Sequence, residues 1–264
     1  MKAYLLTSLF LLCSHSAISG ELPSGDQIAK NINARNEGES VSRLLTMSMT
    51  DKRGKTRTRE TRAFRQYSGE DKHTAIFYLS PSNIKGTAFL TYDYNDLNKD
   101  DDQWLYLPAA RRVRRISASD RGDYFLGTDF TYEEIKLETR VSMLDYDRQS
   151  LRIDTINGTE CVVVESTVKN KKIAKELGIS RREDCVDHKI WMVIKSTQWG
   201  INGHLLKTIY FKEIYKVDDI WTAHKIEVEN HKTKHQTVFT FSDVNYSAPL
   251  DKNLFTQTSL RRGI

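Results

Sequence analysis

The sequence predicts a mainly β protein built around one strongly curved antiparallel sheet or barrel. Three observations favour this class: about a dozen segments alternate apolar and polar residues, short polar turns separate most of them, and one early segment has a helical period. So many strands in one continuous stretch fit a single bent sheet better than two domains. Of the 264 residues, 39% are hydrophobic and 10% aromatic, so the chain can form a core and is not a disordered polymer.

The first residues are typical of an export signal. A basic start and the apolar residues 3–12 precede small residues where signal peptidase cuts, so we expect cleavage after Ser19. Removal of residues 1–19 leaves 20–264 as one domain with a net charge of +4. The apolar stretch is too short to span a bilayer as a helix. A lipid anchor at Cys13 is disfavoured, because a bulky residue precedes it where processing needs a small one.

The helical period lies between Ser24 and Asn36. Ser24 or Asp26 can serve as the N-cap, and Ile28 and Ile32 fall on one apolar side. Strands follow it along most of the chain, as alternating segments between short turns. The expected strands are Leu44–Thr50, Thr56–Tyr67, Lys72–Leu79, Gly86–Tyr94, Gln103–Leu107, Arg112–Ile116, Arg148–Ile156, Glu160–Val168, His188–Ser196, His204–Val217, Ile220–Asn230 and Gln236–Asn245. The clearest hairpin turn among them is Asn157-Gly158.

Two long segments interrupt this series of strands. Residues 117–135 contain aromatic residues without sustained alternation, which indicates a structured loop with a helical turn. Residues 169–184 form a charged connection with a short helical stretch over Ile173 to Leu177. Loops of this length inside a compact domain are commonly functional or disordered.

Two cysteines remain after cleavage, Cys161 and Cys185. In an oxidising compartment a disulfide is the default expectation for such a pair. The expected strands, however, place the two residues near the far ends of neighbouring strands, where their Cα atoms stay beyond bridging distance unless the intervening loop folds back. The sequence leaves both outcomes open.

No linear motif indicates an enzyme. The sequence lacks the nucleophile elbow, the phosphate-binding loop, the paired-histidine zinc motif and the dinucleotide fingerprint. The acidic residues 93–102 lack the glycine and the final acid of a calcium loop, and His231 and His235 flank an expected turn rather than sharing a helix face. We therefore expect no catalytic residue, no metal and no cofactor.

The densest charged feature is a group of five arginines: Arg111, Arg112, Arg114, Arg115 and Arg121. Nucleic-acid binding is disfavoured, because the chain is expected to be exported and its charges are nearly balanced. Two interpretations remain for these residues. They form a solvated edge strand that resists pairing with other chains, or they contact an anionic lipid headgroup or an acidic partner.

One part of the chain closely resembles a known family. Residues 104–123, from Trp104-Leu105-Tyr106-Leu107-Pro108 to Asp120-Arg121-Gly122-Asp123, and residues 127–135 resemble the bacterial outer-membrane lipoprotein-sorting proteins, relatives of LolA. The resemblance extends over essentially all of the chain after the signal. It implies a LolA/LolB-like fold, an unclosed, strongly curved antiparallel half-barrel whose concave side is covered by a helical and loop lid and holds an apolar cavity.

This resemblance also implies a function. It implies a periplasmic carrier that shields lipid or lipoprotein acyl chains, with transient contacts to membrane proteins and an RND-type inner-membrane exporter as a partner. The alternative is an accessory subunit of such an exporter that holds no cargo itself. On the carrier hypothesis, we expect alternate strand residues, the helix and the long loop to line the cavity. The expected lining residues are Ile28, Ile32, Met47, Met49, Phe77, Leu79, Phe89, Trp104, Tyr106, Tyr124, Phe125, Phe130 and Trp191.

Overall fold

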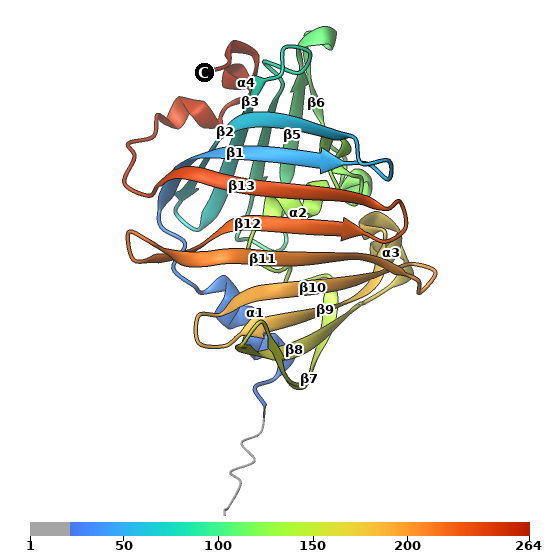
Figure 1. Ribbon diagram of the computed structural model, residues 1–264. Coiled ribbons are helices and arrows are strands. Elements are labelled where there is room, and N and C mark those ends of the chain that lie inside the picture. Colours follow the sequence, from blue (N-terminus) through green and yellow to red (C-terminus); the bar gives the residue numbers. More distant parts are fainter. Residues whose placement is uncertain (1–21) are drawn as a thin grey trace, which may run out of the picture.

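One antiparallel sheet dominates the computed structural model, which describes residues 22–264 (Figure 1). Its strands are β1 Ser40–Thr50, β2 Thr56–Ser68, β3 Asp71–Ser80, β4 Ala88–Asp93, β5 Asp102–Leu107, β6 Arg112–Arg115, β7 Tyr146–Ile156, β8 Thr159–Val168, β9 Ile179–Asp187, β10 Met192–Gly200, β11 Leu205–Val217, β12 Ile220–Asn230 and β13 His235–Asn245. Their order across the sheet is β6-β5-β4-β3-β2-β1-β13-β12-β11-β10-β9-β8-β7. Since β6 and β7 do not pair with each other, the sheet is unclosed, as expected. The predicted signal and Cys13 lie outside the described residues.

The expected strands are present, although β10 begins at Met192 because residues 188–191, expected in that strand, form a turn. One further strand was not expected. The missed strand is β9, which occupies part of the charged connection over residues 169–184. Its charges pair within the sheet: the Arg181 guanidinium lies 3.1 Å from the Glu165 carboxylate and 2.9 Å from that of Glu183. Opposite charges therefore stabilise this strand, which has no alternation of apolar residues for a sequence pattern to detect.

Among residues 22–264, four short α-helices accompany the sheet: α1 Gly25–Asn33, α2 Tyr132–Leu137, α3 Lys171–Leu177 and α4 Gln257–Arg262. The Ser24 side chain accepts a hydrogen bond from the Gln27 amide and caps α1, while Thr131 and Glu134 form a capping box at α2. The expected helical stretch in the charged connection is α3. No helix within the described part of the chain is long and apolar enough to cross a bilayer.

The two faces of the sheet carry different covers. The inner face packs against α1 and the segment that contains α2, which lie on the same side of the sheet in Figure 1. The outer face of β3 to β6 packs against the C-terminal Phe255 and Leu260, the latter in α4. Apolar residues of both faces are therefore buried at this end of the sheet.

Strand register corrects four predicted lining residues: Phe77, Leu79, Trp104 and Tyr106. Phe89 pairs with Leu105 and Leu90 pairs with Trp104, so Trp104 and Phe89 point to opposite faces. Phe77, Trp104 and Tyr106 belong to the outer cluster with the C-terminal helix, and Leu79, on the same side of β3 as Phe77, is 37% exposed. The error came from treating all large apolar residues as one face in strands that are buried on both faces.

The cysteines form a disulfide across neighbouring strands. Cys161 lies on β8 and Cys185 on β9, with their Cα atoms 5.4 Å apart. Because α3 folds the connection back on itself, β9 runs alongside β8 and brings the two thiols together. The bridge packs with Ile194 on the outer face of the sheet.

Candidate functional site

An aromatic plug fills the inner face over β3 to β6. We use this name for residues 117–137, which leave the edge strand β6, cross the inner face and end with α2. The Phe125 ring meets Phe89 of β4 at 5.0 Å and Tyr132 at 5.4 Å, both edge to face, while Phe130 stacks on Phe239 of β13 at 4.2 Å. Edge-to-face and stacked pairs of this kind stabilise aromatic cores beyond their buried area. The long loop predicted from sequence is thus a packed part of the interior.

A buried carboxylate holds the plug in place. Asp129 accepts hydrogen bonds from the Thr237 hydroxyl at 2.7 Å and from the Asn230 amide at 3.0 Å. Lys207 donates to the Asp129 carbonyl oxygen at 2.9 Å and pairs with Glu134 at 2.6 Å. These contacts join the plug to β11, β12 and β13. Together with the contact between Phe125 and Phe89 of β4, they fix the plug to both halves of the sheet.

Beside the plug lies a cavity with largely apolar walls and a volume of about 100 Å³. Its walls come from β1, β2 and β3 on one side, from β10 to β13 on the other, and from the end of the plug. The apolar lining residues are Leu45, Ala63, Ile76, Phe130, Ile135, Leu137, Val141, Met192, Val193, Ile209, Phe211, Ile220, Trp221, Ala223, Ile226, Phe239 and Phe241. A site of this kind suits a hydrocarbon group.

A short segment separates this cavity from a larger polar cleft. Leu137, Arg140 and Val141 line both spaces, and the cleft has a volume of about 720 Å³. We call residues 137–141 the partition. Polar contacts hold it: the Asn33 amide exchanges two hydrogen bonds of 2.9 Å with the Val141 backbone, and Lys72 donates to the Leu137 carbonyl at 3.0 Å.

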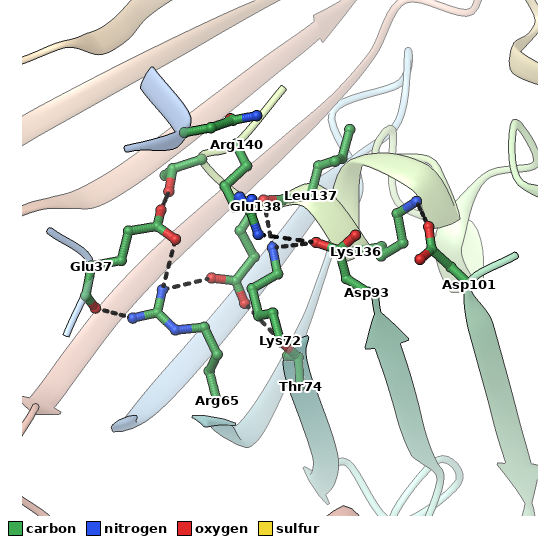
Figure 2. Close-up of polar contacts among 12 residues, drawn as sticks. Glu37, Arg65, Lys72, Thr74, Asp93, Asp101, Lys136, Leu137, Glu138 and Arg140 are labelled. Atoms are coloured by element: carbon green, nitrogen blue, oxygen red, sulfur yellow. Dashed lines mark hydrogen bonds and ion pairs between the residues drawn. The ribbon is translucent and has the colours of Figure 1, made fainter. Parts of the chain in front are cut away.

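The partition also belongs to a buried ion network (Figure 2). Glu138 pairs with Arg43 at 2.9 Å and with Arg65 at 3.5 Å. Glu37 pairs with Arg35 at 2.8 Å, and Lys72 pairs with Asp93 at 3.2 Å. Side chains from β2, β3 and β4 therefore meet the segment that follows α2, as Figure 2 shows.

Two carboxylates of this network, those of Glu37 and Glu138, stay ionised. Burial alone would raise the pKa of Glu37, but Arg65, Lys72 and Arg35 outweigh it and hold that pKa well below its ordinary value. Burial likewise opposes the charge of Glu138, and Arg43 and Arg65 lower its pKa. The network is therefore a set of charges rather than neutral hydrogen-bonding groups.

The structure brings together only part of the predicted cavity lining. Phe130 lines the cavity. Met47, Met49, Phe89 and Phe125 are fully buried, but in the solid core beneath and around the plug. The remaining inner residues lie apart. Ile28 and Ile32 of α1 pack against β8 to β10 together with Trp191, and Tyr124 is 39% exposed with its hydroxyl bonded to Asn230.

The predicted arginine group divides into two sets. Arg111, Arg112, Arg114 and Arg115 are exposed on or beside the edge strand β6. Arg121 is different, because its guanidinium pairs with Asp145 at 2.9 Å and with Glu176 at 3.2 Å and ties the plug to α3. Grouping Arg121 with the surface arginines was wrong, since neighbours in sequence lie on different sides of the turn that begins the plug.

Sequence reasoning missed the charged end of the cavity. Arg65 lies in a segment that alternates Thr and Arg, a pattern interpreted as a half-solvated strand, yet Arg65 is 3% exposed. Arg65 shares its face of β2 with Ala63 and Thr61, which are buried. That small residue two positions away was the available signal that this face points inward. Within residues 22–264, no group of His, Cys, Asp or Glu side chains is arranged to hold a metal ion.

The bent, unclosed sheet and its covered inner cavity define a LolA-like protein. Three solved structures share this fold over most of the chain. A DUF1329 family protein from Desulfovibrio piger is 26% identical, with a TM-score of 0.81, over 89% of this chain and 97% of that one. A domain from Vibrio parahaemolyticus named for outer-membrane lipoprotein sorting is 28% identical, also with a TM-score of 0.81, over 90% and 98%. A LolA superfamily protein from Nitrosomonas europaea is 18% identical, with a TM-score of 0.67 over 90% and 99%, and shows the fold alone.

Comparison of sequences gives the family. Residues 70–262 match a family model described as "Uncharacterized protein". No curated protein matches the chain. The chain belongs to this family, and it is LolA-like, as the resemblance of the residues around the plug indicates.

Proposed function

We propose that this protein is a periplasmic carrier that shields the acyl chains of a lipid or lipoprotein during transfer toward the outer membrane. The observation that carries this proposal is the apolar cavity between β10 to β13 and the partition. Exposure of an acyl chain to water costs about 0.8 kcal/mol for each methylene, so a lipid needs a shielding protein to cross an aqueous compartment. The LolA-like family membership supports the same function.

Cargo entry requires the partition to move. Sites for drug-sized ligands have volumes of about 300 to 1,000 Å³, and the cavity has about 100 Å³. Displacement of residues 137–141 would join the cavity to the cleft of about 720 Å³ beside it. The partition is suited to this movement because polar contacts hold it, and water can replace polar contacts when they open.

The predicted lining residues take different roles in this proposal. Phe130 would contact cargo directly, while Ile28, Ile32, Met47, Met49, Phe89, Phe125 and Trp191 would support the walls. Tyr124 would join the plug to β12 through its bond to Asn230. Phe77, Leu79, Trp104 and Tyr106 would have no contact with cargo, since they lie on the outer face.

A cavity-filling substitution tests the carrier function. Ser196 lines the cavity, is fully buried, and its hydroxyl has no hydrogen-bond partner, so Ser196→Leu reduces the volume without removing a contact. We expect the mature protein, purified after export, to yield bound lipid on extraction and mass spectrometry, and Ser196→Leu to yield at most about a third as much. Ser242→Leu, on the exposed side of β13, is the matched control and should retain the full amount. Absence of lipid from the unmodified protein, also after incubation with vesicles, would contradict the proposal.

The second candidate is an accessory subunit of an RND-type exporter that holds no cargo. The exposed arginines Arg111, Arg112, Arg114 and Arg115 favour it, because a basic edge strand can contact an acidic partner or anionic headgroups. A variant with Gln at Arg112 and Arg114 would then lose association with inner-membrane vesicles. In this case the unmodified protein would bind those vesicles and yield no lipid, which distinguishes the two functions.

A further inference from the structure

One end of the cavity carries more positive than negative charge. The cations that line it are Arg35, Arg43, Arg65 and Arg140, and the carboxylates that line it are Glu37 and Glu138. The neighbouring Lys72 pairs with Asp93, which lines the cleft. Figure 2 shows Arg65 and Lys72 directed toward these carboxylates. The other charged residues of the lining are balanced in pairs, Glu134 with Lys207 at 2.6 Å and Arg182 with Asp184 at 2.7 Å. Four arginines therefore face two carboxylates at this end.

The matching negative charge lies on the cleft side of the partition. There Lys136 and Arg121 face a larger number of carboxylates, from Asp101, Glu133, Asp145 and Glu176, all of which line the cleft. The partition thus separates a positive cavity end from a negative cleft. Since arginine does not lose its proton in proteins, and four arginines line this end against two glutamates, the positive excess in the cavity persists at neutral pH.

Several guanidinium groups at this end have N–H groups without a hydrogen-bond acceptor in the protein. Arg35 Nε and Nη1, Arg43 Nε and Arg65 Nε are buried and have no hydrogen-bond partner in the protein. The side chains of Arg35 and Arg65 are only 8% and 4% exposed. Buried donors are almost always satisfied in proteins, so such a group of orphaned N–H groups points to an oxyanion acceptor.

The apolar wall begins directly beside these donors. Arg43 and Leu45 are two residues apart on β1, and Arg65 and Ala63 are two residues apart on β2, so each pair shares the inner face. Arg43 also lies over the Phe241 ring, 4.6 Å from its centre. A ligand here meets cations at one end and hydrocarbon at the other, which is the chemistry of an anionic amphiphile.

We propose that Arg35, Arg43 and Arg65 bind the carboxylate or phosphate head of an anionic lipid whose chain enters the apolar cavity. This inference rests on the carrier function proposed above and adds the charge of the cargo. The head would accept hydrogen bonds from the unpartnered guanidinium donors, and the chain would extend along the inner face toward Ile226 and Phe239.

Ligands that differ only in the head test this inference on the unmodified protein. The probes are oleate, oleoyl lysophosphatidate and the neutral monoolein, which share one chain, and inorganic phosphate, which has none. We expect oleate and lysophosphatidate to bind about tenfold more tightly than monoolein by calorimetry below their aggregation concentrations. Phosphate should bind much more weakly than lysophosphatidate, because it lacks the chain.

Neutralising variants then locate the site. Arg43→Gln and Arg35→Gln each remove one cation, so the preference for oleate over monoolein should fall about threefold or more in each. Arg62→Gln is the matched control, because Arg62 lies on β2 on the face opposite to Arg65 and should leave the preference unchanged. The ratio of two affinities measured on the same variant separates head recognition from a general loss of folding.

Each outcome has one interpretation. Equal binding of oleate and monoolein would overturn the oxyanion site and leave the carrier function intact. A preference that survives in both arginine variants would also overturn it, since the head would then bind elsewhere. Phosphate binding as tight as that of lysophosphatidate would show a site for free anions and overturn the lipid assignment. Binding of none of the lipids would instead contradict the carrier function itself.

Discussion

The inner face has a plug half, β3 to β6, and a cavity half, β10 to β13. Both halves are built from strands with apolar inner side chains, but these side chains have different surroundings in the two halves. Over β3 to β6 the aromatic plug packs directly on the sheet, with Phe125 and Phe89 fully buried. Over β10 to β13, the apolar side chains of the strands face a cavity instead. An apolar inner face is therefore necessary for a binding site but does not identify it. What identifies the site is the segment that covers each half.

The plug half should be the more sensitive to truncation. Phe125→Ala should lower the free energy of unfolding by about 4 kcal/mol, because it removes a fully buried ring that contacts two others. Denaturant unfolding measures this loss. The bound lipid per folded molecule should change little, since Phe125 does not line the cavity. A large loss of cargo with unchanged stability would reverse the roles assigned to the two halves.

The disulfide should stabilise the end of the sheet next to the cavity half. It joins β8 to β9, and its residues are separated by 24 positions. Closing a loop of this size restricts the unfolded chain by about 3 kcal/mol in the chain-entropy model. The double variant Cys161→Ala and Cys185→Ala should therefore lose about this much stability under non-reducing conditions. Reducing agent should destabilise the unmodified protein similarly and leave the double variant unaffected.

The ion network at the cavity end should make stability fall in acid. The pKa of Glu37 lies below its ordinary value of 4.5 when the protein is folded, so its contribution is complete above pH 4.5 and is lost as pH falls toward the folded value. The free-energy difference between the unmodified protein and Glu37→Gln should shrink by about 1.4 kcal/mol for each pH unit below 4.5. If this difference in free energy of unfolding stays constant between pH 6 and pH 3, roughly the range that this linkage spans, the cations do not lower the pKa of Glu37.

The sequence predicted the sheet better than the site, for a physical reason. Alternation and turn residues are local, so the hairpin at Asn157-Gly158 and the strand carrying Met47 and Met49 follow directly from neighbouring residues. Whether Trp104 points inward depends on its pairing with Leu90 and on the C-terminal helix, which lie far away in sequence. The strand pattern left a strongly curved sheet and a barrel open, and the resemblance to the LolA-like family predicted that the sheet is unclosed.

The cavity end was the least predictable part. Arg35, Arg65 and Glu138 come from separate elements, and their burial becomes favourable only when they meet. A strand pattern places charged residues on the solvent face by default, which is where Arg65 was assigned. Periodicity can show, through Ala63, that the face of β2 carrying Arg65 points inward, but it does not show which charged partners Arg65 meets there.

A matched pair of aliphatic truncations gives the smallest and sharpest comparison of the two halves. Leu105 of β5 is 5% exposed and lies in the core of the plug half. Ile226 of β12 is 8% exposed and lines the cavity. Each loses three carbon atoms on mutation to Ala. Because Ile226 already borders empty space, it has fewer contacts to lose, and we expect Leu105→Ala to cost about 1 kcal/mol more than Ile226→Ala.

Cargo binding should respond in the opposite order to stability. Ile226→Ala enlarges the cavity and should therefore change the affinity for oleate. Leu105→Ala should leave that affinity unaltered at a temperature where both variants are folded. Unfolding in denaturant and calorimetric titration of the same two proteins measure both quantities. Equal stability losses with equal changes in affinity would mean that the plug half takes part in cargo binding, because the two halves would then behave as one continuous apolar surface.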